Sequence, residues 1–271
     1  MSEPTPPPRA PRVEILRLTP AWDGPRGREL CERFASDPGA LAAGTVLWAD
    51  RNQLYRIRLD GEPGGEVVVK RFPIRALVPR LVYLLRSSKA ARSFDNAVRL
   101  AALGVGTPAP LAAWQVRAGG LPAVAFYCCA YLEHWMLARD LKFEGAPATP
   151  ELLAAIGGFV ARLHRLGVLH HDLTAGNILM VRDGTEPAGV SFHLIDLNRL
   201  AFRRVGLASG IANLAQLGNF PFEDALLAGY CRGRGVEVAR ARPLFRALLG
   251  MRTLRWKIKN GTRPLRRKLG L

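Results

Sequence analysis

Short apolar runs with the alternation typical of β-strands dominate residues 41–133. The runs lie at residues 44–48, 53–59, 66–70, 111–116 and 121–132. The turn sequence DGEPGG at residues 60–65 separates the second run from the third and predicts a β-hairpin. We therefore expect a small sheet in this part of the chain.

A helical pattern interrupts these strands at residues 86–103. The face predicted from its spacing is formed by Phe94, Val98 and Ala101 or Ala102. Ser87 or Ser88 is suited to the N-cap, and Gly104 is a typical residue just after a helix ends. Strands around one helix predict an N-terminal lobe that is mostly sheet.

From Thr149 onward the apolar spacing becomes helical. Thr149 as N-cap and Pro150 at the first helical position predict a helix that ends at Gly167. Its apolar face is expected to contain Leu152, Ile156, Val160 and Leu163. Apolar runs at 178–181 and 192–195 flank an Asp-Gly turn at 183–184 and predict a second hairpin, and residues 208–256 are helical again.

The fold class expected from this order is α+β, with a β-rich lobe followed by a helical lobe. We divide the chain into four segments: 1–40, a Pro-rich flexible tail and lead-in; 41–133, the N-terminal lobe; 134–250, the helical lobe; and 251–271, a basic tail. The first twelve residues hold five prolines and no apolar run, so we do not expect a signal peptide.

The charge narrows the range of partners. Lys and Arg exceed Asp and Glu by 39 − 22 = 17, which favours an anionic partner such as a membrane surface, a nucleic acid or a phosphorylated substrate. The four cysteines form no C-x-x-C pair, so we expect no disulfide partner and a reducing, cytoplasmic compartment.

The sharpest chemical signal is HHDLTAGNIL at residues 170–179, followed by LIDLN at 194–198. This order resembles the catalytic loop and metal-binding segment of the protein-kinase-like superfamily. In that arrangement Asp172 accepts or orients the proton of an attacking hydroxyl, while Asn177 and Asp196 hold Mg²⁺ against the phosphates of ATP. Each piece alone could be an ordinary turn, but together they lie in order around a predicted hairpin.

The strand at residues 66–70 ends on Lys70 and resembles the strand of the same superfamily whose lysine binds the nucleotide phosphates. Asp95 is the acidic residue on the following helix and its expected partner. An exposed strand end and an exposed helical Asp remain alternatives. The chain departs from protein kinases in lacking G-x-G-x-x-G, D-F-G and A-P-E, and Thr174 replaces the usual loop lysine.

Within the superfamily, the chain most resembles the lipopolysaccharide core (Kdo/heptose) kinases, over roughly residues 45–230. The matching motifs are VKRF at 69–72, LAALGVGTP at 100–108, HHDLTAGNIL at 170–179 and LIDLNR at 194–199. The resemblance implies a two-lobed protein-kinase-like fold, ATP and Mg²⁺ as cofactors, and transfer of phosphate to a Kdo or heptose hydroxyl of lipopolysaccharide or a lipid-linked sugar. It also implies that Glu133 lies at the hinge that binds adenine.

Two basic stretches fit such an acceptor. Residues 71–94 and 252–271 contain many Arg and Lys residues, interleaved with apolar ones, and no acid. They favour a peripheral position on the cytoplasmic face of the inner membrane, although a solvated basic face or RNA binding would give the same composition. We do not expect nucleic acid as the partner.

Two other functions remain open from the residues. One is a phosphotransferase for a small alcohol such as an aminoglycoside or a choline-like compound. The other is a catalytically inactive kinase-like scaffold that binds membrane or nucleic acid. The missing glycine-rich loop favours the scaffold, whereas retention of Lys70, Asp172, Asn177 and Asp196 favours the enzyme.

Overall fold

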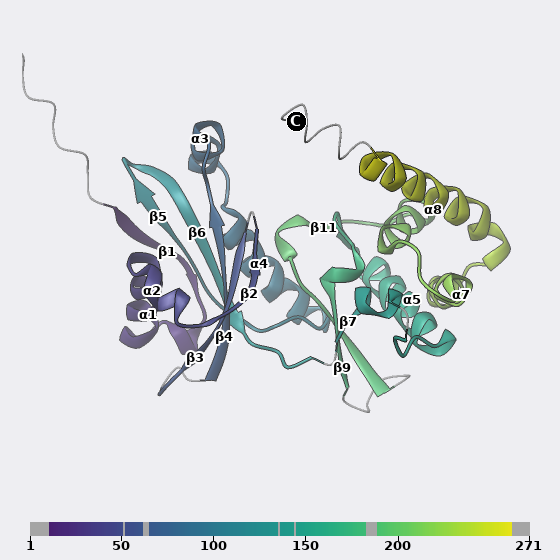
Figure 1. Ribbon diagram of the computed structural model, residues 1–271, viewed down its shortest axis with the longest axis horizontal. Coiled ribbons are helices and arrows are strands. Elements are labelled where there is room, and N and C mark those ends of the chain that lie inside the picture. Colours follow the sequence, from purple (N-terminus) through teal and green to yellow (C-terminus); the bar gives the residue numbers. More distant parts are fainter. Residues whose placement is uncertain are drawn as a thin grey trace, which may run out of the picture. The chain divides into compact units, whose positions relative to one another are not determined.

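The chain divides into two units, residues 1–132 and 133–271. The structure is a computed structural model, and it describes residues 11–50, 52–61, 65–134, 136–143, 145–182 and 189–261. The first unit is built on a six-stranded sheet, and the second is mostly helical (Figure 1). This agrees with the predicted α+β fold.

The sheet of the first unit is antiparallel throughout, in the order β1-β5-β6-β4-β3-β2. Its strands are β1 (Arg12–Leu18), β2 (Thr45–Ala49), β3 (Gln53–Leu59), β4 (Gly65–Pro73), β5 (Pro110–Ala118) and β6 (Leu121–Ala130). The helices of this unit are η1 (Pro20–Trp22), α1 (Pro25–Ser36), α2 (Pro38–Ala42), α3 (Leu77–Leu85) and α4 (Lys89–Ala102). The predicted hairpin is confirmed: Ile57 of β3 lies opposite Val67 of β4.

The predicted flexible tail and lead-in up to residue 40 is wrong from Arg12 on. β1 pairs with β5, with Ile15 opposite Trp114, and α1 buries Leu30 and Phe34. The prolines that suggested a tail are concentrated before these elements. The alternating apolar residues of β1 are the signal that the prediction overlooked.

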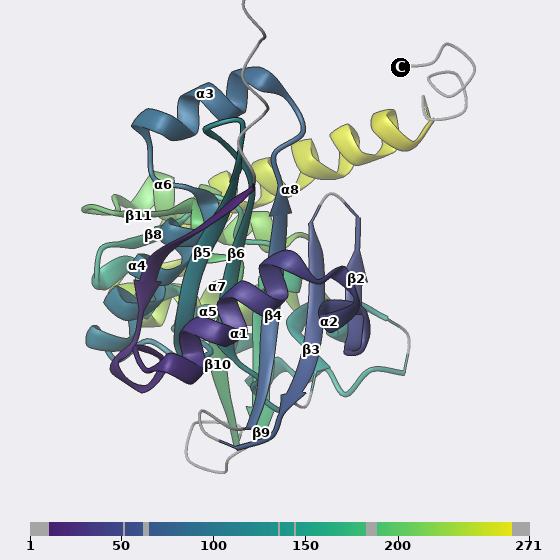
Figure 2. The same cartoon turned by 90° about the vertical axis from the view of Figure 1, so that its left-hand side faces the viewer.

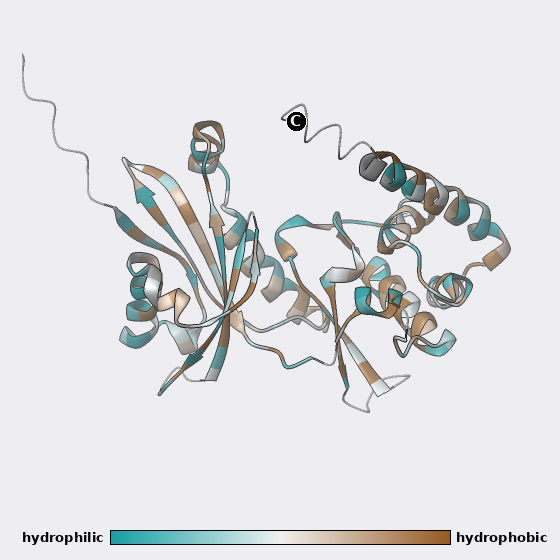
Figure 3. Ribbon diagram, in the orientation of Figure 1, coloured by the Kyte–Doolittle hydropathy of each residue, from teal (hydrophilic) through white to brown (hydrophobic). Residues whose placement is uncertain are grey.

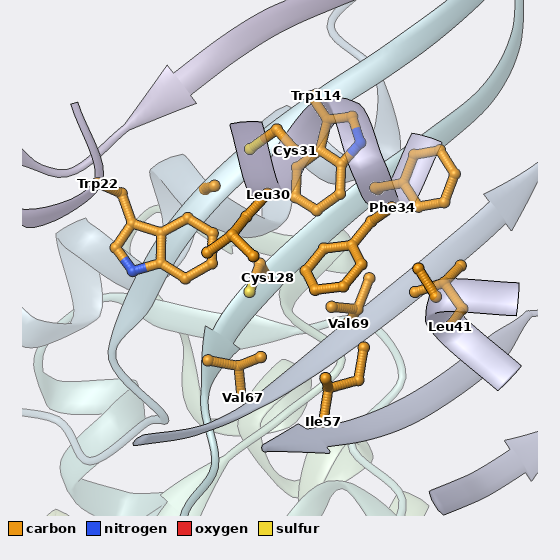
Figure 4. Packing of buried hydrophobic residues seen from close by; sticks show 13 residues of the cluster. Trp22, Leu30, Cys31, Phe34, Leu41, Ile57, Val67, Val69, Trp114 and Cys128 are labelled. Atoms are coloured by element: carbon orange, nitrogen blue, oxygen red, sulfur yellow. The ribbon is translucent and has the colours of Figure 1, made fainter. Parts of the chain in front are cut away.

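The two faces of the sheet carry separate clusters of buried residues. Helix α1 covers one face of the sheet (Figure 2), where Val67 and Val69 of β4 pack with Leu30 and Phe34 (Figure 4). In the same cluster the Trp114 and Phe126 rings stack 5.2 Å apart. Phe72 of β4 belongs to the cluster on the other face, which contains residues of α4. Because side chains alternate along a strand, Lys70 is directed to the same face as Phe72.

Helix α4 has the predicted N-cap but a different buried face. The Ser88 side chain accepts a hydrogen bond from Ala91 N at 3.1 Å. Phe94, Ala97 and Leu100 are buried, whereas Val98 is 47% exposed. Phe94 is buried as predicted, but Val98, Ala101 and Ala102 are exposed, because the alanines Ala90, Ala91 and Ala97, which carry little hydrophobic signal in a sequence, form the rest of the buried face.

The second unit contains five short strands and four longer helices among the residues that the structure describes. Its strands are β7 (Met136–Leu137), β8 (Val168–His170), β9 (Ile178–Arg182), β10 (Val190–Leu194) and β11 (Leu200–Phe202). The helices are η2 (Ala138–Lys142), α5 (Pro150–Arg165), η3 (Ala175–Asn177), η5 (Leu197–Arg199), α6 (Leu207–Leu214), η6 (Ala215–Leu217), α7 (Glu223–Arg234) and α8 (Val238–Gly261). Here the labels α5 to α8 mark the four longer helices.

Two predictions for this unit are confirmed. Thr149 caps α5 by accepting a hydrogen bond from Leu152 N, and the four residues expected on its apolar face are buried. β9 and β10 form the predicted hairpin, with Phe192 opposite Met180. The turn at residues 183–184 lies outside the described residues.

Glycines allow α5 and α7 to pack closely. A Cβ at Gly157 of α5 would lie 2.1 Å from the Leu226 carbonyl oxygen, and one at Gly229 of α7 would lie 2.0 Å from that of Ala154. Any other residue at either position would force the helices apart.

The helical segment predicted for residues 208–256 is present but broken into α6, η6, α7 and α8. α8 continues without a break to Gly261, so residues 251–261 of the predicted basic tail are helical, and the remainder lies outside the described residues. Within the part of the chain that the structure describes, no helix is both long and apolar enough to cross a bilayer.

Candidate active site

The loop that carries Asp172 is held between two strands of the second unit. β8 ends at His170 and pairs with β11, with Leu200 opposite His170. Just before β11, the Arg199 carbonyl oxygen accepts a hydrogen bond from His171 N at 2.9 Å. The segment that follows Asp196 is thereby fixed beside the loop.

The His170 ring connects the loop to Asp196. The ring is buried; its Nδ1 accepts the Asp172 backbone N–H at 3.1 Å, so Nε2 carries the proton and donates to the Ile195 carbonyl at 3.2 Å. Burial lowers the pKa of His170, which favours this neutral form. His170 therefore orients the loop, and a neutral ring is sufficient for that role.

Asp172 presents its carboxylate at the surface of the unit. The side chain is 40% exposed, and its Oδ2 lies 3.2 Å from Nη1 of Arg199. Its carbonyl oxygen, by contrast, accepts hydrogen bonds from Thr174 N at 2.7 Å and Asn177 Nδ2 at 2.8 Å. The backbone is thus fixed while the carboxylate remains accessible to a hydroxyl group.

Asn177 and Asp196 are brought together by the backbone. Ile195 N donates to the Asn177 carbonyl at 3.0 Å, so the residue before Asp196 is bonded to Asn177. Because Nδ2 of Asn177 donates to Asp172, the side-chain oxygen of Asn177 is the atom that could accept a cation. Asp196 has a left-handed backbone (φ 58°, ψ 51°), and its Oδ1 accepts from Asn198 Nδ2 at 2.7 Å.

This donor set suits a magnesium ion that is also bound by phosphates. Mg²⁺ prefers oxygen ligands, keeps several waters, and is commonly held by one or two protein side chains plus substrate phosphates. An amide oxygen and a carboxylate meet that requirement. Among the described residues no group of three or more His, Cys, Asp and Glu side chains could hold a metal by itself.

A buried polar network is bonded to the start of the Asp172 loop. Asn213 of α6 donates through Nδ2 to the His170 carbonyl at 2.8 Å, so its Oδ1 accepts from Nε2 of His164 at 3.0 Å. Nδ1 of His164 then accepts from the Tyr230 hydroxyl at 2.9 Å. Burial lowers the pKa of His164 to about 4, so the network is neutral. A Cβ at Gly210 would collide with the Tyr230 hydroxyl.

Lys70 and Asp95 lie in the first unit. Lys70 lies in a central strand, opposite Leu54 of β3 and Tyr127 of β6, with Nζ 5.3 Å from the Phe72 ring centroid. Asp95 on α4 binds Arg17 of β1 through both oxygens, at 2.7 and 3.2 Å. The structure pairs Asp95 with Arg17, and the Lys70–Asp95 pairing remains a prediction.

Two other predicted features lie near the ends of elements. Glu133 is exposed and is the first residue of the second unit. The second is the short connection between β2 and β3, in a chain that lacks the glycine-rich motif, where Asp50 N donates to the Asn52 carbonyl at 3.1 Å. Arg51 lies outside the described residues.

Sequence reasoning missed the roles of Arg199 and Asn213. The missing loop lysine, replaced by Thr174, signals that another cation should accompany Asp172. Arg199 ends the LIDLNR motif, and in the structure its guanidinium pairs with the Asp172 carboxylate. Asn213 gave no comparable signal, because a single polar residue on a helix is unremarkable until its partners are known.

Comparison with known proteins agrees with this arrangement. A 3-deoxy-D-manno-octulosonic acid kinase of Vibrio vulnificus is 38% identical over 104 residues, which are 36% of this chain and 42% of that relative. A probable bifunctional tRNA threonylcarbamoyladenosine biosynthesis protein of Methanosarcina acetivorans is 33% identical over 101 residues, 36% of this chain and 16% of that relative. The matches thus span less than half the length of either relative.

A solved structure of WaaP in complex with acyl carrier protein superimposes with a TM-score of 0.55 at 20% identity, over 89% of this chain and 95% of that one. This similarity confirms the predicted kinase-like fold. The model of the lipopolysaccharide kinase (Kdo/WaaP) family matches residues 78–224, more than half of the chain. That span holds the whole Asp172 loop, Asn177 and Asp196, and the chain belongs to the lipopolysaccharide kinase (Kdo/WaaP) family.

Proposed function

We propose that this protein is an ATP-dependent kinase that phosphorylates a Kdo or heptose hydroxyl of the lipopolysaccharide inner core. The observation that carries the proposal is the fixed loop geometry of the second unit. Asp172 has an accessible carboxylate on a hydrogen-bonded backbone, and Asn177 and Asp196 are joined through the Ile195–Asn177 bond.

Asp172 orients the acceptor hydroxyl and takes its proton as the acceptor oxygen bonds to the γ-phosphorus. The bond between that phosphorus and the leaving ADP oxygen breaks in the same transfer. Asn177 and Asp196 would hold Mg²⁺, which neutralises phosphate charge when it is bound. Arg199 adds positive charge next to the carboxylate.

Lys70 is proposed to bind the α- and β-phosphates of ATP, and Glu133 to lie where backbone groups receive adenine. The pairing of Asp95 with Lys70 belongs to the same proposal. For Asp95 and Glu133 the support is that they lie within the family match at residues 78–224, and for Lys70 it is the position in the central strand β4.

The proposed acceptor also implies where in the cell the protein acts. Inner-core sugars are attached to a lipid, so a kinase acting on them would work at the cytoplasmic face of the inner membrane as a peripheral protein. The net charge of +17 suits an anionic surface and a phosphorylated glycolipid.

The experiment is transfer of labelled phosphate from ATP, with Mg²⁺, to dephosphorylated lipopolysaccharide core and, in parallel, to a panel of aminoglycosides and choline-like alcohols. Asp172→Asn keeps the size of the side chain and removes the base, so turnover should fall by roughly 10²- to 10⁴-fold. Binding of ATP should change little.

Asp224→Asn is a matched control, because Asp224 is also an exposed acid of the second unit paired with an arginine, Arg246. It should retain full turnover. Label on a small alcohol alone would replace the sugar acceptor, and ATP binding without transfer to any acceptor would favour the scaffold.

A further inference from the structure

Helix α3 has its apolar residues on the outside. Leu77, Val78, Leu81, Val82 and Leu85 recur at helical spacing and form one face, and all are exposed, from 41% for Val82 to 92% for Leu85. No residue of α3 is buried. Figure 3 shows the hydrophobic colouring of this helix. A helix packed only for the stability of its own unit would present the opposite face to solvent.

Polar contacts hold α3 in this orientation. On the side away from the apolar face, Arg80 donates to the carbonyl oxygens of Ala118, Leu121 and Pro122, at 2.8, 3.3 and 2.9 Å. These residues surround the turn between β5 and β6. Ile74 N donates to the Ala123 carbonyl at 2.9 Å just before the helix begins. The guanidinium therefore bonds to the carbonyl groups at this end of the sheet, while the apolar face of α3 remains exposed.

The charged residues that flank α3 in the sequence are all basic. Arg75 precedes α3 and Arg86 follows it, and both are exposed. Residues 71–94 contain no Asp or Glu. An apolar helical face with cations at both ends is complementary to a bilayer interface, where acyl chains lie beneath anionic headgroups.

We propose that α3 lies in the plane of an anionic membrane surface and inserts its apolar face between the lipids. A second copy of the chain is a poorer occupant, because two such helices would bring their cations together. The inference rests on the membrane position proposed above and assigns it to one helix. Its test measures lipid binding and not phosphate transfer, so the two proposals can fail separately.

The first test is co-sedimentation of the full chain with vesicles of phosphatidylethanolamine and phosphatidylglycerol, compared with phosphatidylcholine alone. Leu81→Asp should weaken binding to the anionic vesicles by at least about tenfold. Arg86→Gln should weaken it about fivefold, and more at low than at high salt. Val98→Asp is the matched control, because Leu81 and Val98 are both apolar helix residues of the first unit and both 47% exposed.

The second test reports insertion directly. All four cysteines are buried, and burial raises the pKa of Cys31 and Cys129 to about 12, so an introduced surface cysteine can be labelled selectively. A polarity-sensitive fluorophore on Leu85→Cys should shift to shorter wavelength when anionic vesicles are added. The same fluorophore on Val98→Cys should not.

Three results would overturn the proposal. They are unchanged vesicle binding by Leu81→Asp, a Leu85→Cys label that stays in water on bound vesicles, and a shift without vesicles that accompanies concentration-dependent dimers. The last result would assign the helix to a contact between copies. Retention of full phosphate transfer to soluble core by Leu81→Asp is expected in either case, because α3 lies outside the residues proposed for transfer.

Discussion

The loop around Asp172 and the strand–helix pair around Lys70 hold their charged groups in different ways. Three side chains fix the loop: the buried His170 ring, the half-buried Asn177 amide and the buried Asn213 amide each donate to a backbone carbonyl. Asp95, in contrast, is 44% exposed and bonded to Arg17, itself 45% exposed. The loop is preorganised, whereas the Asp95 ion pair is exposed to solvent and salt.

The difference indicates which side chains are already held in place before nucleotide binds. For the loop, the positions of Asp172, Asn177 and the Ile195–Asp196 segment follow from bonds already present, so each substitution has a definite expected effect. For Asp95, the effect depends on whether the carboxylate exchanges partners when nucleotide binds. Substitutions in the two regions should therefore differ in their effects.

Asp196→Asn should have the largest effect among them. The change removes the charged metal ligand of the proposed site but keeps its size, so turnover should fall roughly 10²- to 10³-fold. The Mg²⁺ concentration required for half-maximal turnover should rise in the same variant. Titration of Mg²⁺ at saturating ATP measures both quantities, with Asp224→Asn as control. An unchanged Mg²⁺ dependence would remove Asp196 from the metal site.

Asn213→Ala should have the next largest effect, which is a loss of unfolding free energy. Losing this side chain leaves the His170 carbonyl and the His164 ring without their partner in a buried site, which costs about 2–3 kcal/mol of unfolding free energy. Urea unfolding measures this loss. Asn219→Ala is the control, since Asn219 is exposed and its side chain donates to Thr253, so it should cost under about 0.5 kcal/mol. Equal losses in the two variants would contradict the buried role of Asn213.

Much of the loop region could be predicted from the sequence, because its elements are defined by residues close together in the chain. The capped helix α5, the β9–β10 hairpin and the order of Asp172, Asn177 and Asp196 are all encoded within about fifty residues. Short-range signals of this kind are the most reliable in a sequence. The α+β division followed from the same signals.

The features that escaped prediction depend on contacts between distant residues. Arg17 and Asp95 are 78 positions apart, and Asn213 and His170 are 43 apart. The buried face of α4 was wrong because alanine contacts carry no periodic signal. β1 and α1 were hidden by the prolines before them. A sequence pattern states which face is apolar but not which partner will cover it.

The pH dependence of the unfolding free energy tests the buried network of His164, Asn213 and Tyr230 without removing a side chain. His164 has an ordinary pKa of 6.5 and a folded value of about 4, so between these values the unfolded chain binds a proton that the folded chain does not. Unfolding free energy should therefore fall as pH drops from about 7 to 4, by roughly 3 kcal/mol from this group. His164→Gln should lose that part of the slope. His171→Gln, at an exposed position, should keep it, and parallel curves for His164→Gln and the parent chain would contradict the assignment.

Arg199→Gln should reduce turnover by roughly 10- to 100-fold with little change in stability. The Arg199 guanidinium pairs with the Asp172 carboxylate, and it is 59% exposed, so its removal leaves no buried charge. Arg199→Lys should recover part of the loss, because charge is restored without the planar fork. Arg246→Gln breaks a comparable exposed pair on α7 and α8 and serves as control. Full activity in Arg199→Gln would show that the ion pair is incidental.

Arg17→Gln should have the smallest effect. Whether it strengthens or weakens ATP binding shows which partner Asp95 uses when nucleotide is bound. If Asp95 leaves Arg17 to pair with Lys70 when ATP binds, removing Arg17 removes a competitor, and ATP should bind a fewfold more tightly because exposed pairs contribute at most about 1 kcal/mol. Asp95→Asn should then weaken ATP binding, and the double variant should match Asp95→Asn alone. Calorimetric titration with Mg²⁺ and ATP measures all three. Weaker binding in Arg17→Gln would mean that the Arg17–Asp95 pair is itself the working arrangement, holding α4 to β1, and that Lys70 binds phosphate without an acidic partner on α4.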